Sequence, residues 1–327
     1  MATRSLVKVK KTIRSKVDLT IITPCFNEVL TVEECATSVR EIMKQKLPKV
    51  SYEHIFVDNA STDGTVSVLR EVSRKDSRVK VIVNSRNIGP FRNMYSAMKL
   101  SSGNAVIPML PADLQDPAEV IPELYLEWNK GYMVVYGERV NRQEFILMRV
   151  VRALYYRIIN LLSESNIPLN VGEFMIIDKR ISDRICELND HYPYIRGLVA
   201  QSTSNISFVQ YTWKRRKRGK SKSNLIRLID QAINGLVSTS RAPARLALLT
   251  GFLTSTIGIL LGIWSLILNL VYGTQTYDGI PTIAVTLFIL GGVQLFFLGL
   301  IGEYVLSIHS QVRQLPKEFI TEKINFK

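Results

Sequence analysis

The sequence predicts an α/β protein that combines a Rossmann-like, mostly parallel sheet with amphipathic interface helices and two transmembrane helices. Two observations support this prediction. Residues 19–110 alternate short apolar runs with amphipathic helical patterns, a rhythm typical of βαβ units. Near the C-terminus, Leu246–Tyr277 and Gly279–Gly302 contain no charged residue, and each has the roughly 20 mostly apolar residues that a transmembrane helix requires.

Short apolar runs mark the strands in chain order, and helical patterns such as Glu28–Gln45 and Thr65–Ser73 fill the gaps. The expected strands are Leu19–Thr23, Tyr52–Asp58, Val79–Val83, Ala105–Met109 and Tyr132–Tyr136. In parallel sheets, ligands bind beyond the carboxyl ends of the strands. The polar residues that collect at those ends are Asn27, Glu28, Asp58, Arg86, Asn87 and Asp113. The sequence therefore predicts a binding site along this edge.

Two later helical patterns are amphipathic. Arg142–Leu162 places its arginines on one arc, and Leu225–Arg241 separates an apolar side from a polar side. Such helices lie on a membrane surface or pack on the protein core. Both interpretations stay open for Arg142–Leu162. Leu225–Arg241 leads directly into a predicted span, which favours the membrane.

The charge balance favours an anionic partner. The 327 residues include 42 Lys and Arg against 28 Asp and Glu, which gives a formal net charge of +14. Nucleic acid, anionic lipid and phosphorylated substrates all suit this balance, and the two spans favour lipid and phosphate. The cysteines, Cys25, Cys35 and Cys186, fit a reducing compartment and show no metal-site spacing.

Charges beside the spans predict the orientation in the membrane. Arg241 and Arg245 precede the first span, Arg313 and Lys317 follow the second, and the short loop around Asp278 has no Lys or Arg. By the positive-inside rule, both termini and the catalytic domain are cytoplasmic, in an inner or plasma membrane. No secretory signal is visible, because the basic N-terminal stretch has no apolar core behind it.

One acidic motif, Asp58–Gly64, ends a strand and opens a helix. A carboxylate there can hydrogen-bond a nucleobase or ribose, and Asp63 can cap the helix. A capped turn without any ligand explains the motif equally well.

A second acidic motif, Asp113–Pro117, follows the fourth strand. Its two carboxylates and one amide can hold a divalent cation against a diphosphate. The alternative is a helix N-terminus with Asp116 as N-cap and Pro117 at the first helical position. Both can hold at once, with Asp113 pointing into the site.

The basic run Lys214–Lys222 reads KRRKRGKSK. A solvated loop or a nucleic-acid patch is the simpler interpretation of such a run. Its place just before the amphipathic helix favours a lipid phosphate or the anionic headgroup surface instead. We therefore expect no nucleic-acid partner, and aromatic stacking residues are sparse there, with only Tyr211 and Trp213 adjacent.

Together the ordered motifs resemble the family 2 glycosyltransferases that charge a polyprenyl phosphate, the group of dolichol-phosphate mannose synthases and bactoprenol glucosyltransferases. The resemblance covers nearly the whole chain from residue 19. The matching segments are residues 23–28 (TPCFNE), 57–65 (VDNASTDGT), 85–89 (SRNIG), 112–117 (ADLQDP), 172–174 (GEF), 196–197 (RG), 218–222 (RGKSK) and 302–304 (GEY).

The resemblance implies a GT-A fold, a Mg²⁺ or Mn²⁺ ion, a UDP- or GDP-sugar donor, a polyprenyl phosphate acceptor and a homo-oligomer in the bilayer. It places Asp113 and Gln115 at the metal and diphosphate. The expected nucleotide-pocket residues are Pro24, Asn27, Glu28, Asp58 and, nearby, Arg86. The residues expected to meet the acceptor phosphate or the donor diphosphate are Arg139, Arg218, Lys220, Ser221 and Lys222.

The chemistry needs no dedicated base. A phosphate monoester is already anionic at neutral pH, so its oxygen can attack the anomeric carbon directly and invert it. The obstacles are repulsion between two anions and the charge that grows on the leaving nucleoside diphosphate. A cation with Arg and Lys clamps answers both through positioning and electrostatic preorganisation.

The chain departs from the family pattern at two motifs. Pro111 stands where the family usually has the first Asp of Asp-Ala-Asp, and Asn59-Ala60 stands where it usually has Asp-Gly. One carboxylate near the metal is therefore missing. This leaves a catalytically silent membrane scaffold as the alternative to an active enzyme, and we favour the enzyme because the nucleotide and basic motifs remain.

The expected organisation has five parts. They are a basic arm (1–17), a GT-A domain (18–223), an amphipathic juxtamembrane helix (224–245), a two-helix membrane module (246–308) and a cytoplasmic tail (309–327).

Overall fold

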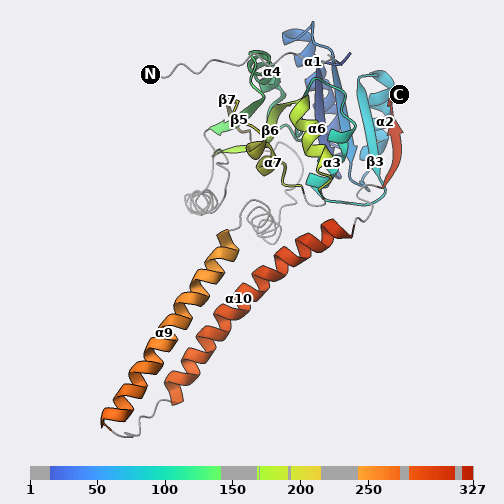
Figure 1. The fold of residues 1–327 in the computed structure, drawn as a ribbon. Helices are drawn as coiled ribbons and strands as arrows, with labels where there is room; N and C mark the ends of the chain where they lie inside the picture. The colour runs from blue at the N-terminus through green and yellow to red at the C-terminus, as the bar shows by residue number, and fades with distance from the viewer. Residues whose placement is uncertain are drawn as a thin grey trace, which may run out of the picture.

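The computed structural model describes residues 15–140, 168, 170–190, 193–214, 242–272, 280–313 and 319–326. Its α/β domain is built on an eight-stranded sheet in the order β7-β5-β6-β4-β1-β2-β3-β8, flanked by helices on both faces (Figure 1). Two long helices extend away from that domain, so the α/β body and the apolar module are separate regions of the molecule, as the sequence predicts.

The centre of the sheet is parallel and its margins are mixed. Strands β1 (Leu19–Cys25), β2 (Tyr52–Asp58), β3 (Val79–Asn84) and β4 (Ala105–Ile107) run parallel. Strand β6 (Val171–Asp178) is antiparallel to both β4 and β5, and β7 pairs parallel with β5. The bounds of the remaining two strands on this side are Val134–Val140 for β5 and Ile206–Thr212 for β7.

Helices cover both faces of the sheet, which explains why its central strands are apolar without alternation. All seven residues of β2 are buried, including His54 and Asp58. Strands covered on both faces need not alternate apolar and polar residues, so the polar side chains of β2 are buried together with its apolar ones. The strand has the bounds that the sequence predicted.

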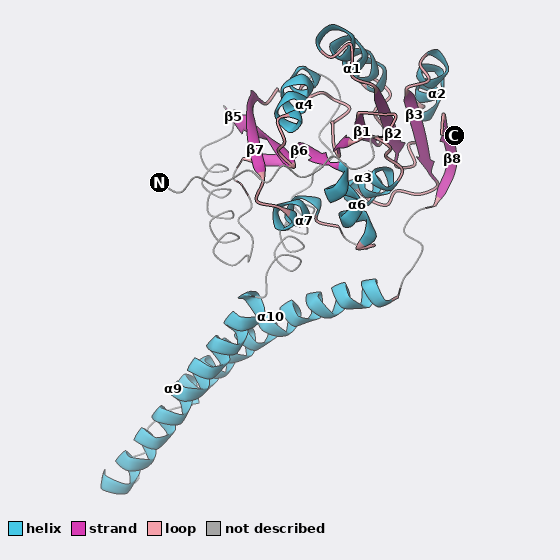
Figure 2. Ribbon diagram, turned by 45° about the horizontal axis from the view of Figure 1, so that its top comes forward, coloured by secondary structure: helices cyan, strands magenta, loops and turns pink. Residues whose placement is uncertain are grey.

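The helices divide between the two faces (Figures 1 and 2). Apolar side chains of α1, α2 and α4 pack on one face, and those of α3, α6 and α7 pack on the other. Their bounds are Val32–Lys46 for α1, Thr65–Lys75 for α2, Pro90–Lys99 for α3, Ile121–Asn129 for α4, Lys179–Glu187 for α6 and Ile195–Ser202 for α7. A 3₁₀ turn, η1 (Ala118–Val120), precedes α4.

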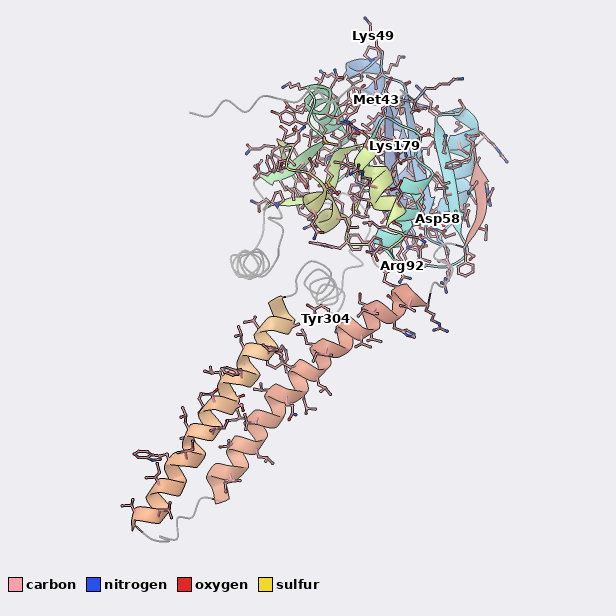
Figure 3. The ribbon with its side chains drawn as sticks, viewed as in Figure 1. Met43, Lys49, Asp58, Arg92, Lys179 and Tyr304 are labelled. Carbon is pink, nitrogen blue, oxygen red and sulfur yellow. The ribbon has the colours of Figure 1, made fainter. Side chains whose placement is uncertain are left out.

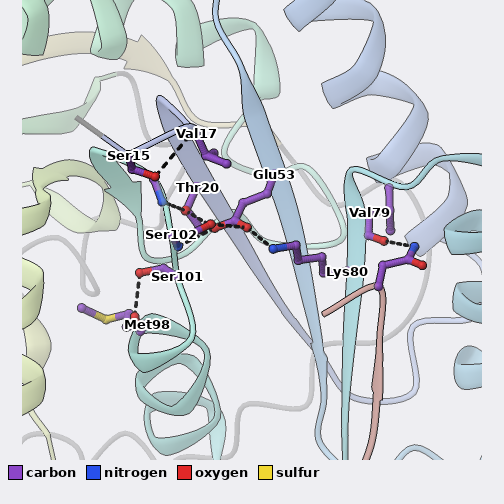
Figure 4. A network of polar contacts seen from close by, with 11 residues as sticks. Ser15, Val17, Thr20, Glu53, Val79, Lys80, Met98, Ser101 and Ser102 are labelled. Atoms are coloured by element: carbon purple, nitrogen blue, oxygen red, sulfur yellow. Dashed lines mark hydrogen bonds and ion pairs between the residues drawn. The ribbon is translucent and has the colours of Figure 1, made fainter. Parts of the chain in front are cut away.

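A buried carboxylate joins the amino ends of the central strands (Figure 4). Glu53 at the start of β2 accepts hydrogen bonds from Thr20 Oγ1 of β1 (2.6 Å) and from the Ser102 backbone N–H (2.6 Å), and it pairs with Lys80 of β3 (2.5 Å). Since every contact lies at the end of the sheet opposite to Asp58, this cluster stabilises the scaffold and leaves the carboxyl ends to the site.

The C-terminal segment returns to the α/β domain. Residues 309–327 were expected to form a tail, but β8 (Ile320–Ile324) pairs antiparallel with β3 and completes one edge of the sheet. Arg70 of α2 makes an ion pair with Glu322 of β8, 252 residues away in the sequence (2.6 Å). This strand is short and has few apolar residues, so no local sequence pattern predicted it.

Helices α9 (Ala242–Tyr272) and α10 (Ile280–Val312) lie side by side as an apolar hairpin (Figures 1 and 2). By length and composition, Leu246–Trp264 and Ile289–Val312 can each cross a membrane, with mean hydropathies of 2.0 and 1.8. The described part of α9 ends at Tyr272, and α10 extends beyond the predicted Gly302. The predicted amphipathic helices Arg142–Leu162 and Leu225–Arg241 fall outside the described residues.

Candidate functional site

The carboxyl ends of the central strands face the apolar helices α9 and α10. In Figure 3, Asp58 and Arg92 lie at the end of the α/β domain nearest α10, whereas Lys49 lies at the far end. Gln311 near the end of α10 donates a hydrogen bond to the side chain of Asp190, which joins the helix to the domain. Any ligand bound at the strand ends is therefore held on the side of the domain from which the hairpin extends.

Hydrogen bonds join the loops after β1 and β2 into one unit. The Asn27 side-chain oxygen accepts from the backbone N–H of Thr62 (2.7 Å), and the backbone N–H of Asn27 donates to Ser61 Oγ (2.8 Å). The N–H of Glu28 donates to Thr65 Oγ1 (2.9 Å). Side chains thus join the two loops, so that Pro24, Asn27 and Glu28 lie beside the Asp58 loop.

Three site loops contain a residue other than glycine in the left-handed region. Asn27 follows β1 with φ 54°, Ala60 follows β2 with φ 61°, and Leu114 follows β4 with φ 53°. This conformation costs roughly 1–2 kcal/mol for residues with a Cβ atom, and such strain gathers at functional sites. It also explains the family's preference for glycine at the position of Ala60, because glycine adopts a positive φ freely.

Asp58 presents an unused acceptor at the end of β2. Its Oδ2 accepts from the Ser61 N–H (2.9 Å), whereas Oδ1 is buried with no hydrogen-bond partner among the described residues. Burial raises the pKa of Asp58, and the Ser61 hydrogen bonds oppose that rise. A buried acceptor without a donor is costly unless a ligand supplies one. An N–H of a nucleobase or a ribose hydroxyl would satisfy it.

The loop after β3 is fastened to the Asp58 loop through Asn59. The Asn59 amide donates to Asn87 Oδ1 (2.9 Å) and accepts from the Ile88 N–H (2.8 Å). An amide can donate and accept at once, whereas an ionised carboxylate only accepts. This pairing explains why Asn59 suits the position where the family usually has Asp. The loop also carries Arg86, which is exposed at the strand end.

Asp113 and Gln115 lie in the loop after β4. The Gln115 N–H donates to Asp113 Oδ1 (3.1 Å), and the Gln115 carbonyl accepts from the Lys214 N–H (3.0 Å). The first residue of the basic run is therefore held against the predicted metal loop. Arg218, Lys220, Ser221 and Lys222 lie outside the described residues.

Asp116 does not cap the turn that follows it, which rules out the alternative interpretation of this motif as a helix N-terminus capped by Asp116. The residue before η1 is Pro117, and Asp116 is buried and holds Arg139 in a two-bond pair (2.9 and 2.7 Å). Tyr211 of β7 donates to the same carboxylate and accepts from Arg139 Nε (3.0 Å). A buried carboxylate is more strongly stabilised by a bidentate guanidinium than by backbone N–H groups at the end of a short turn.

Arg139 is consequently fixed rather than mobile. Burial alone would lower the pKa of Arg139, but the Asp116 carboxylate raises it well above its ordinary value. A Cβ atom at Gly172 would lie 2.9 Å from Arg139 Nη2, so the glycine provides the space that this side chain occupies. The predicted phosphate-binding residue is thus a guanidinium with a preset position and a permanent charge.

A second ion pair, between Glu173 and Arg196, lies close to Arg139. Glu173, the neighbour of Gly172, accepts from Arg196 Nη2 (2.7 Å). Burial alone would raise the pKa of Glu173, but the charges of Arg196 and Arg139 bring it below its ordinary value. The motifs that contain Glu173 and Arg196 are both visible in the sequence, but the contact between them is not. Glu173 lies in β6 and Arg196 lies in α7, and only the folded structure brings these elements together.

A hard divalent cation fits the donor set at Asp113. No group of three or more His, Cys, Asp or Glu side chains comes together in the part of the chain that the structure describes. Mg²⁺ is commonly held by one or two carboxylates, substrate phosphates and water. One half-buried carboxylate beside an amide, at a strand-end loop, suits that mode of binding better than a closed protein cage.

A match to a family model identifies the protein family to which this arrangement of strands and loops belongs. The model for glycosyl transferase family 2 matches residues 20–186, which contain β1 to β6 and the Asp58, Arg86 and Asp113 loops. The chain belongs to glycosyl transferase family 2. This membership agrees with the observed sheet, so the fold is the GT-A fold that the sequence predicted.

The similarity of this glycosyltransferase to known proteins extends through the membrane hairpin. A model described as the GtrB C-terminal hairpin matches residues 242–308, a range that includes all of α9 and most of α10. A bactoprenol glucosyl transferase from an SfII prophage of Shigella flexneri is 31% identical over 303 residues, 92% of this chain and 97% of that protein. YkcC of Bacillus subtilis, named an uncharacterised glycosyltransferase, is 33% identical over 92% of both chains.

Among solved structures, a mannosyltransferase of Pyrobaculum calidifontis in complex with GDP-mannose and Mn²⁺ is 17% identical to this chain. The match covers 92% of this chain and 87% of that one, with a TM-score of 0.46. The full-length relatives named as transferases support an enzyme, and the alternative of a silent scaffold finds no support among them.

Proposed function

We propose that this glycosyltransferase moves a sugar from a nucleotide-sugar donor to a polyprenyl phosphate at the cytoplasmic face of a membrane, with inversion at the anomeric carbon. The observation that carries this proposal is the similarity to a bactoprenol glucosyl transferase across both the catalytic domain and the hairpin. A substrate with a long apolar tail suits an enzyme whose strand ends face its own apolar helices.

The donor occupies the strand-end loops in this proposal. The nucleobase or ribose meets Asp58 Oδ1, the buried acceptor that lacks a donor among the described residues. Pro24, Asn27 and Glu28 line the same pocket because their loop is bonded to the loop after β2. Arg86 lies in the loop after β3, which the Asn59–Asn87 hydrogen bond joins to the Asp58 loop.

Asp113 and Gln115 would hold a Mg²⁺ or Mn²⁺ ion. When bound, the ion offsets the negative charge that grows on the leaving nucleoside diphosphate. Arg139 is held in place by Asp116 and Tyr211, and in this proposal its remaining N–H donors meet the phosphates without reorganising. Arg218, Lys220, Ser221 and Lys222 supply the clamp for the acceptor phosphate.

The acceptor needs no base, because its phosphate oxygen is already charged. That oxygen forms the new bond to the anomeric carbon while the bond from that carbon to the nucleoside diphosphate breaks. Both anions must be held within reach of each other, and the work of the site is therefore positioning and charge neutralisation.

A direct test uses purified full-length protein in lipid nanodiscs with undecaprenyl phosphate, Mg²⁺ and a panel of radiolabelled UDP- and GDP-sugars. We expect one donor to yield a labelled lipid whose anomeric configuration, read by NMR, is opposite to that of the donor. Retention of configuration, or the absence of labelled lipid with every donor, would contradict the proposal.

Asp113→Ala tests the metal loop. We expect a loss of transfer of about 100-fold or more, because removing a group that neutralises developing charge has effects of this size. The matched control is Glu123→Ala, which removes an exposed carboxylate from α4. Initial rates under a Mg²⁺ titration measure both variants. Normal turnover by Asp113→Ala would remove this residue from the site.

A further inference from the structure

The C-terminal segment reaches the donor side of the sheet. Strand β8 pairs with β3 from Val81 to Asn84, with an irregular register between Val83 and Asn84. Just beyond it, the Ser85 N–H donates to the Phe319 carbonyl (2.8 Å). The loop that carries Arg86 therefore begins on a backbone contact with the end of the chain.

Phe319 also contacts the side chain of Arg86. The Arg86 guanidinium carbon lies over the Phe319 ring, 4.6 Å from its centroid. Phe319 is 41% exposed, so its ring is not needed to fill the core. A guanidinium that stacks on an aromatic ring loses rotamer freedom while it keeps its charge and its outward donors.

The same loop is held from its other side by the donor pocket. Asn87 accepts from Asn59 (2.9 Å), and Asn59 follows Asp58, the residue with the unpartnered acceptor. Arg86 thus stands between a contact to the nucleotide loop and a contact to the C-terminal segment. Thr321 Oγ1 strengthens the second contact by donating to the Val83 carbonyl (3.1 Å).

From this juxtaposition we propose that Phe319 is a positioning residue for the donor site, and that it holds Arg86 in the orientation that binds the donor nucleotide. The proposal deepens the function proposed above and depends on it. It assigns to the segment that follows the membrane hairpin a part in donor affinity, through Arg86 and without contact with the reacting atoms.

The test measures UDP and GDP binding to the full chain in nanodiscs by calorimetry. For Phe319→Ala we expect an increase of about two- to fivefold in the dissociation constant of the nucleotide that the wild type binds, as loss of a solvent-exposed cation–π contact predicts. The donor KM should rise equally, with kcat unchanged. Phe319→Tyr should restore affinity, and Phe319→Leu, which is apolar but lacks a π face, should not.

Phe326→Ala is the matched control. Phe326 lies on the same segment and stacks on Lys80 (5.1 Å), at the opposite end of β3 from Arg86. An equal loss of nucleotide affinity in this variant, or restoration by Phe319→Leu, would show that only attachment of the segment matters and would overturn the proposal.

A double-mutant cycle isolates the coupling, because Phe319→Ala should have no further effect once Arg86 is alanine. Full additivity of the two changes would overturn the proposal. These binding measurements need no lipid acceptor. If the double-mutant cycle shows the expected coupling but no polyprenyl product forms, the result counts against the proposed acceptor alone. If transfer is normal but Phe319→Ala does not change nucleotide affinity, the result counts against the role of Phe319 alone. If the wild type binds neither nucleotide, the donor-site assignment and this inference fall together.

Discussion

Single residues at this site hold unfavourable conformations and charges, and their neighbours compensate for them. Ala60 has a positive φ of 61° two residues after the buried Asp58, and Leu114 has a positive φ of 53° directly after Asp113. A network of side-chain hydrogen bonds holds the first of these loops in place. Residues at special backbone angles thus sit next to the residues proposed to meet the donor, as preorganisation requires.

Ala60→Gly tests the strain in the loop after β2. We expect the variant to be more stable by about 0.5–1 kcal/mol, because relief of the left-handed strain exceeds the added entropy of glycine in the unfolded chain. A scan of unfolding in detergent at a fixed heating rate should show a higher apparent Tm. A fall in Tm would mean that the Ala60 side chain contributes packing that outweighs the strain.

Glu53 sets a pH dependence at the opposite end of the sheet (Figure 4). Burial alone would raise its pKa, but hydrogen bonds from Lys80, Thr20 and Ser102 bring it below the ordinary value of 4.5. A carboxyl with a lowered pKa stabilises the fold fully above its ordinary pKa. That contribution is lost as pH falls through the lower folded value.

Glu53→Gln should therefore lower the apparent Tm at pH 7, and its difference from the wild type should shrink as pH falls below 4.5. The control is Glu41→Gln on the exposed side of α1, which should change Tm little at any pH. A constant difference between Glu53→Gln and the wild type across that range would mean that the loss comes from packing rather than from charge.

At the scale of elements, β8 is held chiefly by backbone pairing and by one side chain at its end. The Asn325 amide donates to the carbonyls of Ser73 and Val79, both at 2.8 Å, and Asn325 itself has φ 61°. The Arg70–Glu322 pair lies on the surface, with side chains 44% and 36% exposed. Exposed ion pairs contribute about 0–1 kcal/mol, whereas two buried carbonyls that lose their donor cost more.

We therefore expect Asn325→Ala to loosen β8 more than Arg70→Ala does. Amide hydrogen exchange of residues 320–324 reports this directly. The rates in Asn325→Ala should rise by about tenfold or more, and those in Arg70→Ala should stay within about fivefold of the wild type. The reverse order would show that charge, rather than hydrogen bonding, holds the strand.

At the scale of the whole molecule, one sheet contains strands from both sides of the hairpin. Strands β1 to β7 precede α9, and β8 follows α10, so the two ends of the hairpin must return to the same domain. If α9 and α10 span the membrane, the catalytic domain and the C-terminal segment lie on one side of it. By the positive-inside rule, the charge distribution predicts that this side is the cytoplasm.

Cysteine labelling tests this topology. An impermeant maleimide should label Thr274→Cys on intact cells, and it should label Lys49→Cys, at the far end of the catalytic domain, only after the membrane is permeabilised. The wild-type chain measures the background from its three native cysteines, of which Cys25 and Cys35 are buried. Labelling of Lys49→Cys on intact cells would reverse the orientation. The homo-oligomer remains a prediction, to be measured by light scattering in detergent.

The sequence by itself determined the features that depend on local pattern. Continuous apolar runs identified β1 to β4, and two uncharged stretches identified the hairpin, because burial on both faces of a sheet or in lipid selects the same side chains along a continuous segment. The acidic loops after β2 and β4 were also predictable, because each one directly follows the end of a strand.

Only the tertiary structure decided which distant segments meet. Asp116 looked like a helix cap until β5 and β7 brought Arg139 and Tyr211 to it, and Phe319 had no role until β8 paired with β3. Local patterns specify which residues avoid water but not which of several strands becomes the neighbour. That choice depends on the energy of the whole packed sheet, which no single stretch of the chain encodes.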